Sequence, residues 1–164
     1  MEILRRCPQI KVLFRGDFVC DAIDLLAEEC EIKSKELQLE IQLEEFWASE
    51  EYFFHNVYQM NNIAKVCPNL RKMLFQFNEE DAGSFLLLTQ FKRLQELHNW
   101  GGEFYRHKLS HLVQYPDFGP KMTALYLNNV EEMDKGAISI ISNTCPNLET
   151  MGFYNCIFSD KEYL

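Results

Sequence analysis

The chain has 164 residues, a formal net charge of −9 and a hydrophobic content of 47%, which is enough for one domain with a sizeable core. A compact acidic domain repels phosphate backbones, so nucleic acid is not an expected partner. No apolar run approaches the roughly 20 residues that cross a bilayer, so a membrane is not expected either. The six cysteines are too sparse for a disulfide scaffold, and we expect buried thiols in a protein of the cytoplasm or the nucleus.

One short phrase recurs along the chain. Residues 67–75 and 145–153 both read Cys-Pro-Asn-Leu-x-x-Met-x-Phe, and residues 7–13 repeat its first half as Cys-Pro-Gln-Ile-Lys-Val-Leu. Aligning all copies on the apolar residue three places after the leucine gives gaps of 24, 36, 24, 28 and 26 residues by subtraction. These gaps centre on the roughly 20 to 29 residues of a leucine-rich repeat, with one enlarged unit. The anchors are Leu13, Leu37, Met73, Leu97, Leu125 and Met151.

The segments around the anchors are predicted to be strands. Residues 35–40 alternate polar and apolar side chains with a period of two, and residues 122–128 do so at their inward positions. In two copies the second inward position is polar, Arg15 in the first and Asn99 in the fourth, which leaves a register error open there. The inward pairs elsewhere are Met73 with Phe75, Leu125 with Leu127, and Met151 with Phe153.

The stretches between the strands are predicted to be helices, because apolar residues recur there at spacings of three and four. Asp134 is the expected N-cap of the last helix, and the proline of each Cys-Pro-Asn phrase ends the helix before it. The predicted helices cover residues 21–30, 50–66, 83–90, 104–115 and 134–144.

The enlarged unit between Leu37 and Met73 is predicted to hold a longer helix, or a helix with a loop, on the convex side. It carries acidic pairs at residues 44–45 and 50–51, on either side of Phe46 and Trp47. We interpret these pairs as a solvated face, with a docking site for a basic partner as the alternative.

Both ends of the chain are typical of interrupted repeats. Residues 1–6 have the pattern of a last helical turn, and residues 157–164 resemble residues 130–137, which open the last full unit. A repeat array needs polar terminal units to cover its core. We therefore expect a single leucine-rich-repeat domain over residues 1–164 that is truncated at both ends.

Residues 133–138 and 145–156 together resemble one full unit of the cysteine-containing leucine-rich repeat, the subtype typical of F-box/leucine-rich-repeat proteins. The resemblance is fair for residues 67–77 and 7–13 and looser elsewhere. It implies an α/β solenoid of about six repeats, with parallel strands on the concave face and helices on the convex face.

In that family an N-terminal F-box recruits the Skp-cullin ubiquitin ligase, and the repeats hold the protein substrate. The resemblance therefore implies the substrate-binding repeat region of a ubiquitin ligase adaptor. No F-box-like segment precedes the first repeat, so the ligase is an expected partner only if the full-length protein supplies one. A leucine-rich-repeat scaffold or inhibitor unrelated to ubiquitination is the alternative function.

Few residues occur in a pattern that is typical of a catalytic or metal-binding site. Glu103, His107 and His111 fall on one helical face at a spacing that a metal could use, but surface histidines are the favoured interpretation. Cys145 and Cys156 flank the last strand, and no histidine follows Cys145 in the chain. Packing thiols are therefore favoured over a nucleophile. We expect no catalytic residue, no metal and no cofactor, and hence a non-enzymatic protein.

The predicted strand register also predicts a binding surface. Alternate side chains of a strand point to opposite sides, so the middle column of the concave face reads Phe14, Gln38, Leu74, His98, Tyr126 and Gly152. Aromatic side chains gathered in water favour a covering partner; a loop, a flanking repeat or a wrong register is the alternative. The predicted surface for a protein partner consists of Leu74, His98, Trp100, Tyr126 and Tyr154.

Overall fold

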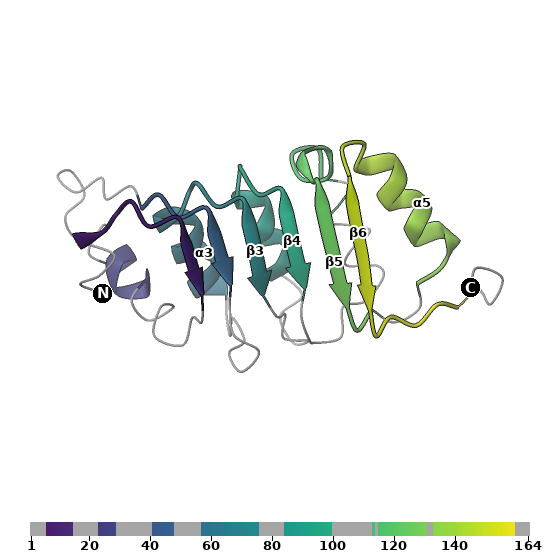
Figure 1. The fold of residues 1–164 in the computed structure, drawn as a ribbon, viewed down its shortest axis with the longest axis horizontal. Coiled ribbons are helices and arrows are strands. Elements are labelled where there is room, and N and C mark those ends of the chain that lie inside the picture. The colour runs from purple at the N-terminus through teal and green to yellow at the C-terminus, as the bar shows by residue number, and fades with distance from the viewer. Residues whose placement is uncertain are drawn as a thin grey trace.

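Six short strands form one all-parallel sheet, and each strand lies beside its neighbour in the chain (Figure 1). The computed structural model describes residues 6–14, 23–28, 41–47, 57–75, 84–99, 113, 115–130 and 133–159. The α/β class with parallel strands that alternate with helices is confirmed. The strands are β1 (Val12–Phe14), β2 (Glu45–Trp47), β3 (Lys72–Phe75), β4 (Glu96–Asn99), β5 (Ala124–Asn128) and β6 (Thr150–Tyr154).

Helices connect the strands, and α3 (Val57–Val66) lies behind the sheet in Figure 1. The last helix, α5 (Lys135–Thr144), begins where the sequence predicts, because the Asp134 carboxylate accepts a 2.8 Å hydrogen bond from the backbone N–H of Ala137. Residues 23–28 are helical as predicted, and the described positions of the predicted helix at 104–115 are residue 113, which is helical, and residue 115, which lies in a bend.

Two connections contain 3₁₀ helices, η1 (Ser84–Gln90) and η2 (Gly119–Lys121). The helix predicted at residues 83–90 is therefore a 3₁₀ helix, which is wound more tightly than an α-helix. It belongs to the shortest unit, with 24 residues between Met73 and Leu97. A 3₁₀ helix rises about 2.0 Å per residue against about 1.5 Å in an α-helix, so it spans the back of a short unit with fewer residues.

The second strand lies at a different place in the chain from the one predicted. β2 pairs in parallel with both β1 and β3, whereas the predicted strand at 35–40 lies outside the described residues. Glu45, Phe46 and Trp47, predicted to lie on the convex side, are thus part of the sheet. With Phe46 in place of Leu37, the gaps between anchors become 33, 27, 24, 28 and 26 by subtraction. The enlarged unit is therefore the first one, which ends at Phe46.

The physical reason is the burial of three apolar side chains that lead into β2. Ile41, Leu43 and Phe46 are at most 1% exposed, and Leu43 precedes Phe46 by three places, as Leu70 precedes Met73. The unit thus keeps the apolar spacing of the repeated phrase but lacks its Cys-Pro-Asn letters.

The same tight turn leads into most of the strands. In each, the backbone N–H of one residue donates to the carbonyl of the residue three places earlier, at 3.1–3.3 Å. Gly119 occupies the first position in one of these turns because a Cβ there would meet the backbone carbonyl oxygens of Val113 and Thr144. The carbonyls that accept these bonds belong to Cys7, Cys67, Phe91, Gly119 and Cys145.

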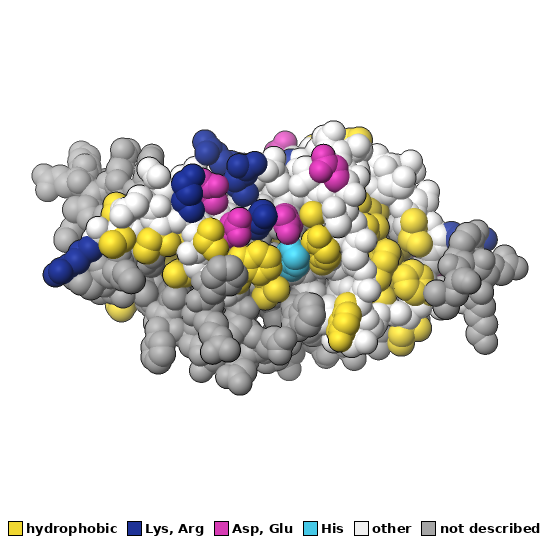
Figure 2. All heavy atoms as spheres, in the orientation of Figure 1, with side chains coloured by type: hydrophobic (Ala, Val, Ile, Leu, Met, Phe, Trp, Pro, Cys, Tyr) yellow, Lys and Arg dark blue, Asp and Glu magenta, His cyan; other side chains and the backbone are white. Residues whose placement is uncertain are grey.

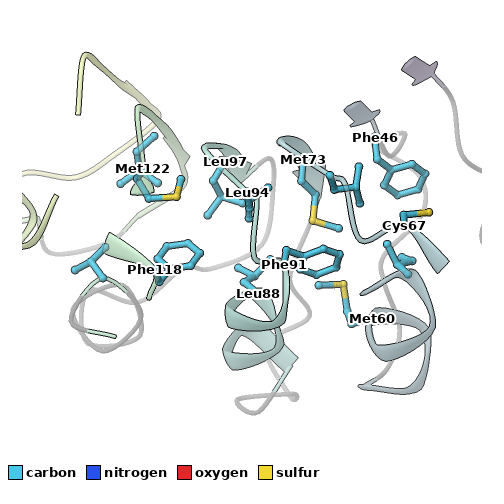
Figure 3. Packing of buried hydrophobic residues seen from close by; sticks show 14 of the residues in the cluster. Phe46, Met60, Cys67, Met73, Leu88, Phe91, Leu94, Leu97, Phe118 and Met122 are labelled. Atoms are coloured by element: carbon cyan, nitrogen blue, oxygen red, sulfur yellow. The ribbon is translucent and has the colours of Figure 1, made fainter. Parts of the chain in front are cut away.

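The core lies between the sheet and the helices. The core-facing column consists of the anchors, and its four central members are fully buried. Figure 3 shows Met73 and Leu97 pointing toward Met60 of α3, Leu88 of η1 and Phe91. The column runs through Leu13, Phe46, Met73, Leu97, Leu125 and Met151.

Asn99 of β4 faces this core, as the sequence register required. It is 1% exposed, and among the described residues neither its amide nitrogen nor its amide oxygen has a hydrogen-bond partner. The polar inward position therefore reflects a buried amide and not a register error.

Candidate protein-binding surface

Strand pairing places one side-chain position from each strand in a row on the face of the sheet opposite the helices. We call this the outer row. Its register at Leu74, His98, Tyr126 and Gly152 is as predicted, and Trp47 takes the place predicted for Gln38, which lies outside the described residues. Figure 2 shows apolar side chains on both sides of the histidine on this face. The outer row consists of Phe14, Trp47, Leu74, His98, Tyr126 and Gly152.

The aromatic rings of the outer row contact one another. His98 stacks on Tyr126 with ring centroids 4.1 Å apart and an interplanar angle of 18°. Trp47 meets the same histidine edge-on at 5.0 Å and 62°, and Leu74 stands in register between these two residues. Such pairs contribute beyond the area they bury, so the three rings form one packed unit.

Gly152 completes the outer row by leaving room for a neighbour. A Cβ at this position would lie 2.6 Å from Cδ1 of Tyr126, a separation that carbon atoms do not adopt. The Tyr126 ring therefore occupies the space above β6 as well as its own place on β5, and the apolar surface continues across both strands.

A second row on the same face, two residues nearer the start of each strand, carries charged side chains. Lys72 Nζ lies 3.5 Å from Glu45 Oε1 and 3.4 Å from Glu96 Oε2. Glu96 Oε1 is 2.7 Å from His98 Nε2, and Trp47 Nε1 donates to Glu45 Oε2 at 3.4 Å. These contacts hold two rings of the outer row in place.

The electrostatics of this second row favour the ionised forms of Lys72 and Glu96. The carboxylates of Glu96 and then Glu45 raise the pKa of Lys72. Burial raises the pKa of Glu96, but the hydrogen bond to His98 and the charge of Lys72 outweigh it, so the pKa of that carboxyl lies below its ordinary value. The alternating charges therefore compensate one another at neutral pH.

The structure brings together three of the five predicted binding residues, Leu74, His98 and Tyr126, each of them partly buried. Tyr154 lies two residues beyond Gly152 on β6 and is 55% exposed. Trp100 lies outside the described residues. Trp47 was missed, although the pattern Leu43-x-x-Phe46 matches the spacing used to align the other repeats.

Two of the four described thiols, those of Cys67 and Cys145, are poorly suited to nucleophilic chemistry, whereas Cys156, also predicted to be a packing thiol, is only partly buried. Cys67 and Cys145 are buried free cysteines, as predicted for packing thiols. Burial raises the pKa of Cys67 to about 12. Burial also raises the pKa of Cys145, with a contact to Thr144 opposing it. Because the thiolate is the nucleophile, neither side chain is reactive near neutral pH.

The described part of the chain contains no group of three His, Cys, Asp or Glu side chains placed to hold a metal ion. The metal-spaced residues Glu103, His107 and His111 lie outside it. Within the described ranges, no helix combines the length and the apolar character that crossing a bilayer requires. Comparison with models of known protein families gives no match, and comparison with curated proteins finds no relative.

Proposed function

We propose that the protein is a leucine-rich-repeat solenoid that recognises another protein through the outer row without catalysing a reaction. Repetition supports the solenoid. Strands follow one another in sheet order, and the same turn precedes five of them. Asn129 and Asn155, 26 positions apart and each just after a strand, both have positive φ, of 55° and 49°. Asparagine tolerates this conformation better than most residues.

The observation that carries the proposal is the outer row itself. Trp47 of β2, His98 of β4 and Tyr126 of β5 form a packed line, on a face that a leucine-rich repeat would turn toward its ligand. Aromatic side chains dominate the energetics of protein interfaces. Because two of the rings are held by side-chain hydrogen bonds and the third stacks on His98, the line is already ordered before a partner arrives, which lowers the entropy cost of binding.

The resemblance of residues 133–138 and 145–156 to the cysteine-containing repeat extends the proposal to the substrate-binding region of an F-box-type ubiquitin ligase adaptor in the cytoplasm or nucleus. In this role, the proteins that bind to the outer row are substrates for ubiquitination. A scaffold or inhibitor of the same fold would hold its partner without changing the partner's abundance.

The test of recognition replaces two rings of the outer row. The Trp47→Ala/Tyr126→Ala double variant is compared with wild type in affinity capture from cell extract, followed by mass spectrometry. Because truncation of an anchor residue typically costs at least about 2 kcal/mol of binding, roughly 30-fold, we expect specific partners to be lost. Tyr58→Ala is the matched control, since Tyr58 is 51% exposed on α3, behind the sheet. Undiminished capture by the double variant would contradict the proposal.

The link to ubiquitin is tested separately. The protein is tagged at its own locus, and co-purification of the Skp and cullin subunits of the ligase is measured. Captured partners should also accumulate when the protein is depleted. Partners whose abundance stays constant, with no ligase subunit co-purified, would favour the scaffold or inhibitor.

A further inference from the structure

Positive charge gathers beside the outer row in a chain whose net charge is −9. Figure 2 shows Lys and Arg side chains along one edge of this face, where β1, β3 and β4 begin. Three carboxylates, of Glu44, Glu45 and Glu96, lie on the same edge. This edge therefore has a surplus of two positive charges. We call the cations the basic rim; they are Lys11, Arg71, Lys72, Lys92 and Arg93.

The rim carboxylates are already engaged. Glu44 pairs with Lys11 at 2.7 Å, and Glu45 and Glu96 share Lys72. The hydrogen bond from Lys11 and the charges of Lys11, Arg71 and Arg93 hold the pKa of Glu44 below its ordinary value. A basic partner would therefore have to displace contacts that exist, which argues against the docking of basic segments on residues 44–45.

Three rim cations form no ion pair with a described carboxylate, although the charges of Arg71 and Arg93 act on Glu44. Arg71 donates only to the neutral side-chain oxygen of Gln95, at 2.8 and 3.1 Å. Lys92 and Arg93 are exposed in the turn before β4, and none of the described carboxylates pairs with them. These are the groups with which an anionic side chain could pair.

The rim lies within reach of any residue seated on the outer row. Arg71 precedes Leu74 by three positions on the same strand path, a distance of roughly 10 Å at about 3.3 Å per residue. That is close to the Debye length of about 8 Å at physiological ionic strength. The charges of the basic rim therefore act on a partner that is anchored on the outer row. Salt largely screens the charges of the distant acidic surface.

We propose that the partner of the outer row is an acidic polypeptide segment, in which an aromatic or aliphatic anchor is accompanied by Asp or Glu side chains that reach Arg71 and Arg93. This inference rests on the proposed function. A long polyanion does not fit the same surface, because it would extend into the field of the acidic remainder of the protein. A short segment with two or three carboxylates satisfies both the rings and the rim.

The experiment selects random displayed dodecapeptides on the immobilised protein and measures the enriched peptides by fluorescence polarisation. Enriched peptides should combine an apolar anchor with at least two acidic residues. Since one exposed ion pair changes affinity by about 1.5- to 5-fold, the double charge reversal Arg71→Glu/Arg93→Glu should weaken binding about 10-fold or more. It should also flatten the salt dependence, because rim charges act on the association rate.

The matched control is Lys65→Glu/Lys135→Glu. It changes the net charge by the same four units at exposed positions of α3 and α5. This variant should bind within about twofold of wild type, because both lysines belong to helices and not to the strand face that carries the outer row.

The outcomes separate the two proposals. Enriched peptides without acidic residues, lost with Trp47→Ala/Tyr126→Ala but insensitive to rim reversal, would overturn the acidic partner and leave protein recognition standing. Acidic peptides that bind regardless of the ring variant would overturn the inference as well, since the outer row would then have no part. Selection that enriches no peptide would count against both.

Discussion

Neighbouring residues of the same strand point to opposite faces of the sheet and have different roles there. Leu97 faces the core and is fully buried, whereas His98, the next residue, lies in the outer row with its side chain 17% exposed. The core face is built from aliphatic side chains and Phe46. The outer face is built from rings, two of which have hydrogen-bond partners on the strands, Trp47 with Glu45 and His98 with Glu96.

This difference separates stability from recognition. Core-facing side chains are interchangeable in kind as long as they fill the volume, whereas the outer row depends on which ring stands where. We therefore expect substitutions on the core face to change the free energy of unfolding, and substitutions on the outer face to change binding.

The largest expected effect comes from the same substitution made on each face. Leu97→Ala should lower the free energy of unfolding by about 2–5 kcal/mol, because it leaves a cavity in the core. Leu74→Ala, on the neighbouring strand, should cost about 1 kcal/mol, since this leucine is only partly buried. Urea titration measures both. Equal losses would mean that the two faces are packed alike.

Two glycines give the next contrast. Gly119→Ala should destabilise by about 1–3 kcal/mol or prevent folding, because a Cβ there meets rigid backbone carbonyls. At Gly152→Ala the obstacle is the Tyr126 side chain, which can rotate away, so the cost should stay below about 1 kcal/mol. The rotation should break the stack on His98, visible as a change in near-UV circular dichroism. An unchanged spectrum would contradict this geometry.

Asn99 is the exception on the core face, and replacing it should be favourable. Asn99→Leu removes an amide without partners and should stabilise the protein by about 1 kcal/mol, seen as a rise in Tm of a few degrees. Asn62→Leu is the control, because Asn62 is equally buried but donates to Asp24 at 2.8 Å. This control should be destabilised. A fall in Tm for Asn99→Leu would indicate that its amide has a function.

The last prediction concerns Lys121, in the turn before β5, whose Nζ donates to the Phe91 carbonyl at 2.6 Å. Burial, with the nearby charge of Lys92, lowers the pKa of Lys121 to about 8, and Asp117 opposes the shift. Between that pH and the ordinary value of about 10.4 the unfolded chain binds more protons, so this group makes stability rise with pH.

The measurement compares wild type with Lys121→Met by urea unfolding from pH 7 to 10. The raised pKa of Cys67 acts in the opposite sense above pH 9, but it is common to both proteins and cancels in the difference. Wild type should gain stability relative to the variant above pH 8. A constant difference would show that Lys121 keeps its ordinary pKa.

The sequence predicted five of the six strands because their anchors have an apolar residue three places earlier, as in the repeated phrase; these anchors are Leu13, Met73, Leu97, Leu125 and Met151. It misplaced the second because residues 35–43 continue one alternation through Leu37, Leu39, Ile41 and Leu43. A period of two identifies a strand but does not fix where along the run it pairs. Pairing is decided by the neighbouring strands, which a linear pattern does not contain.

The outer row was predictable in register but not in its contacts. Alternation placed Leu74, His98 and Tyr126 on one face, while the ring stack and the space above Gly152 depend on side-chain rotamers. The hydrogen bond between His98 and Glu96 follows from the same two-residue alternation. It could have been inferred from the segment Glu96-Leu97-His98.

The order of the strands has a consequence for how the chain acquires its structure. Every ladder joins residues of consecutive units, and the longest separation is 33 residues, between Leu13 and Phe46 (46 − 13). Closing such short loops costs little entropy, and topologies rich in local contacts fold fast. Assembly can therefore nucleate in the middle, around β3 and β4, and spread to either side, so amide exchange should be slowest there and fastest in β1.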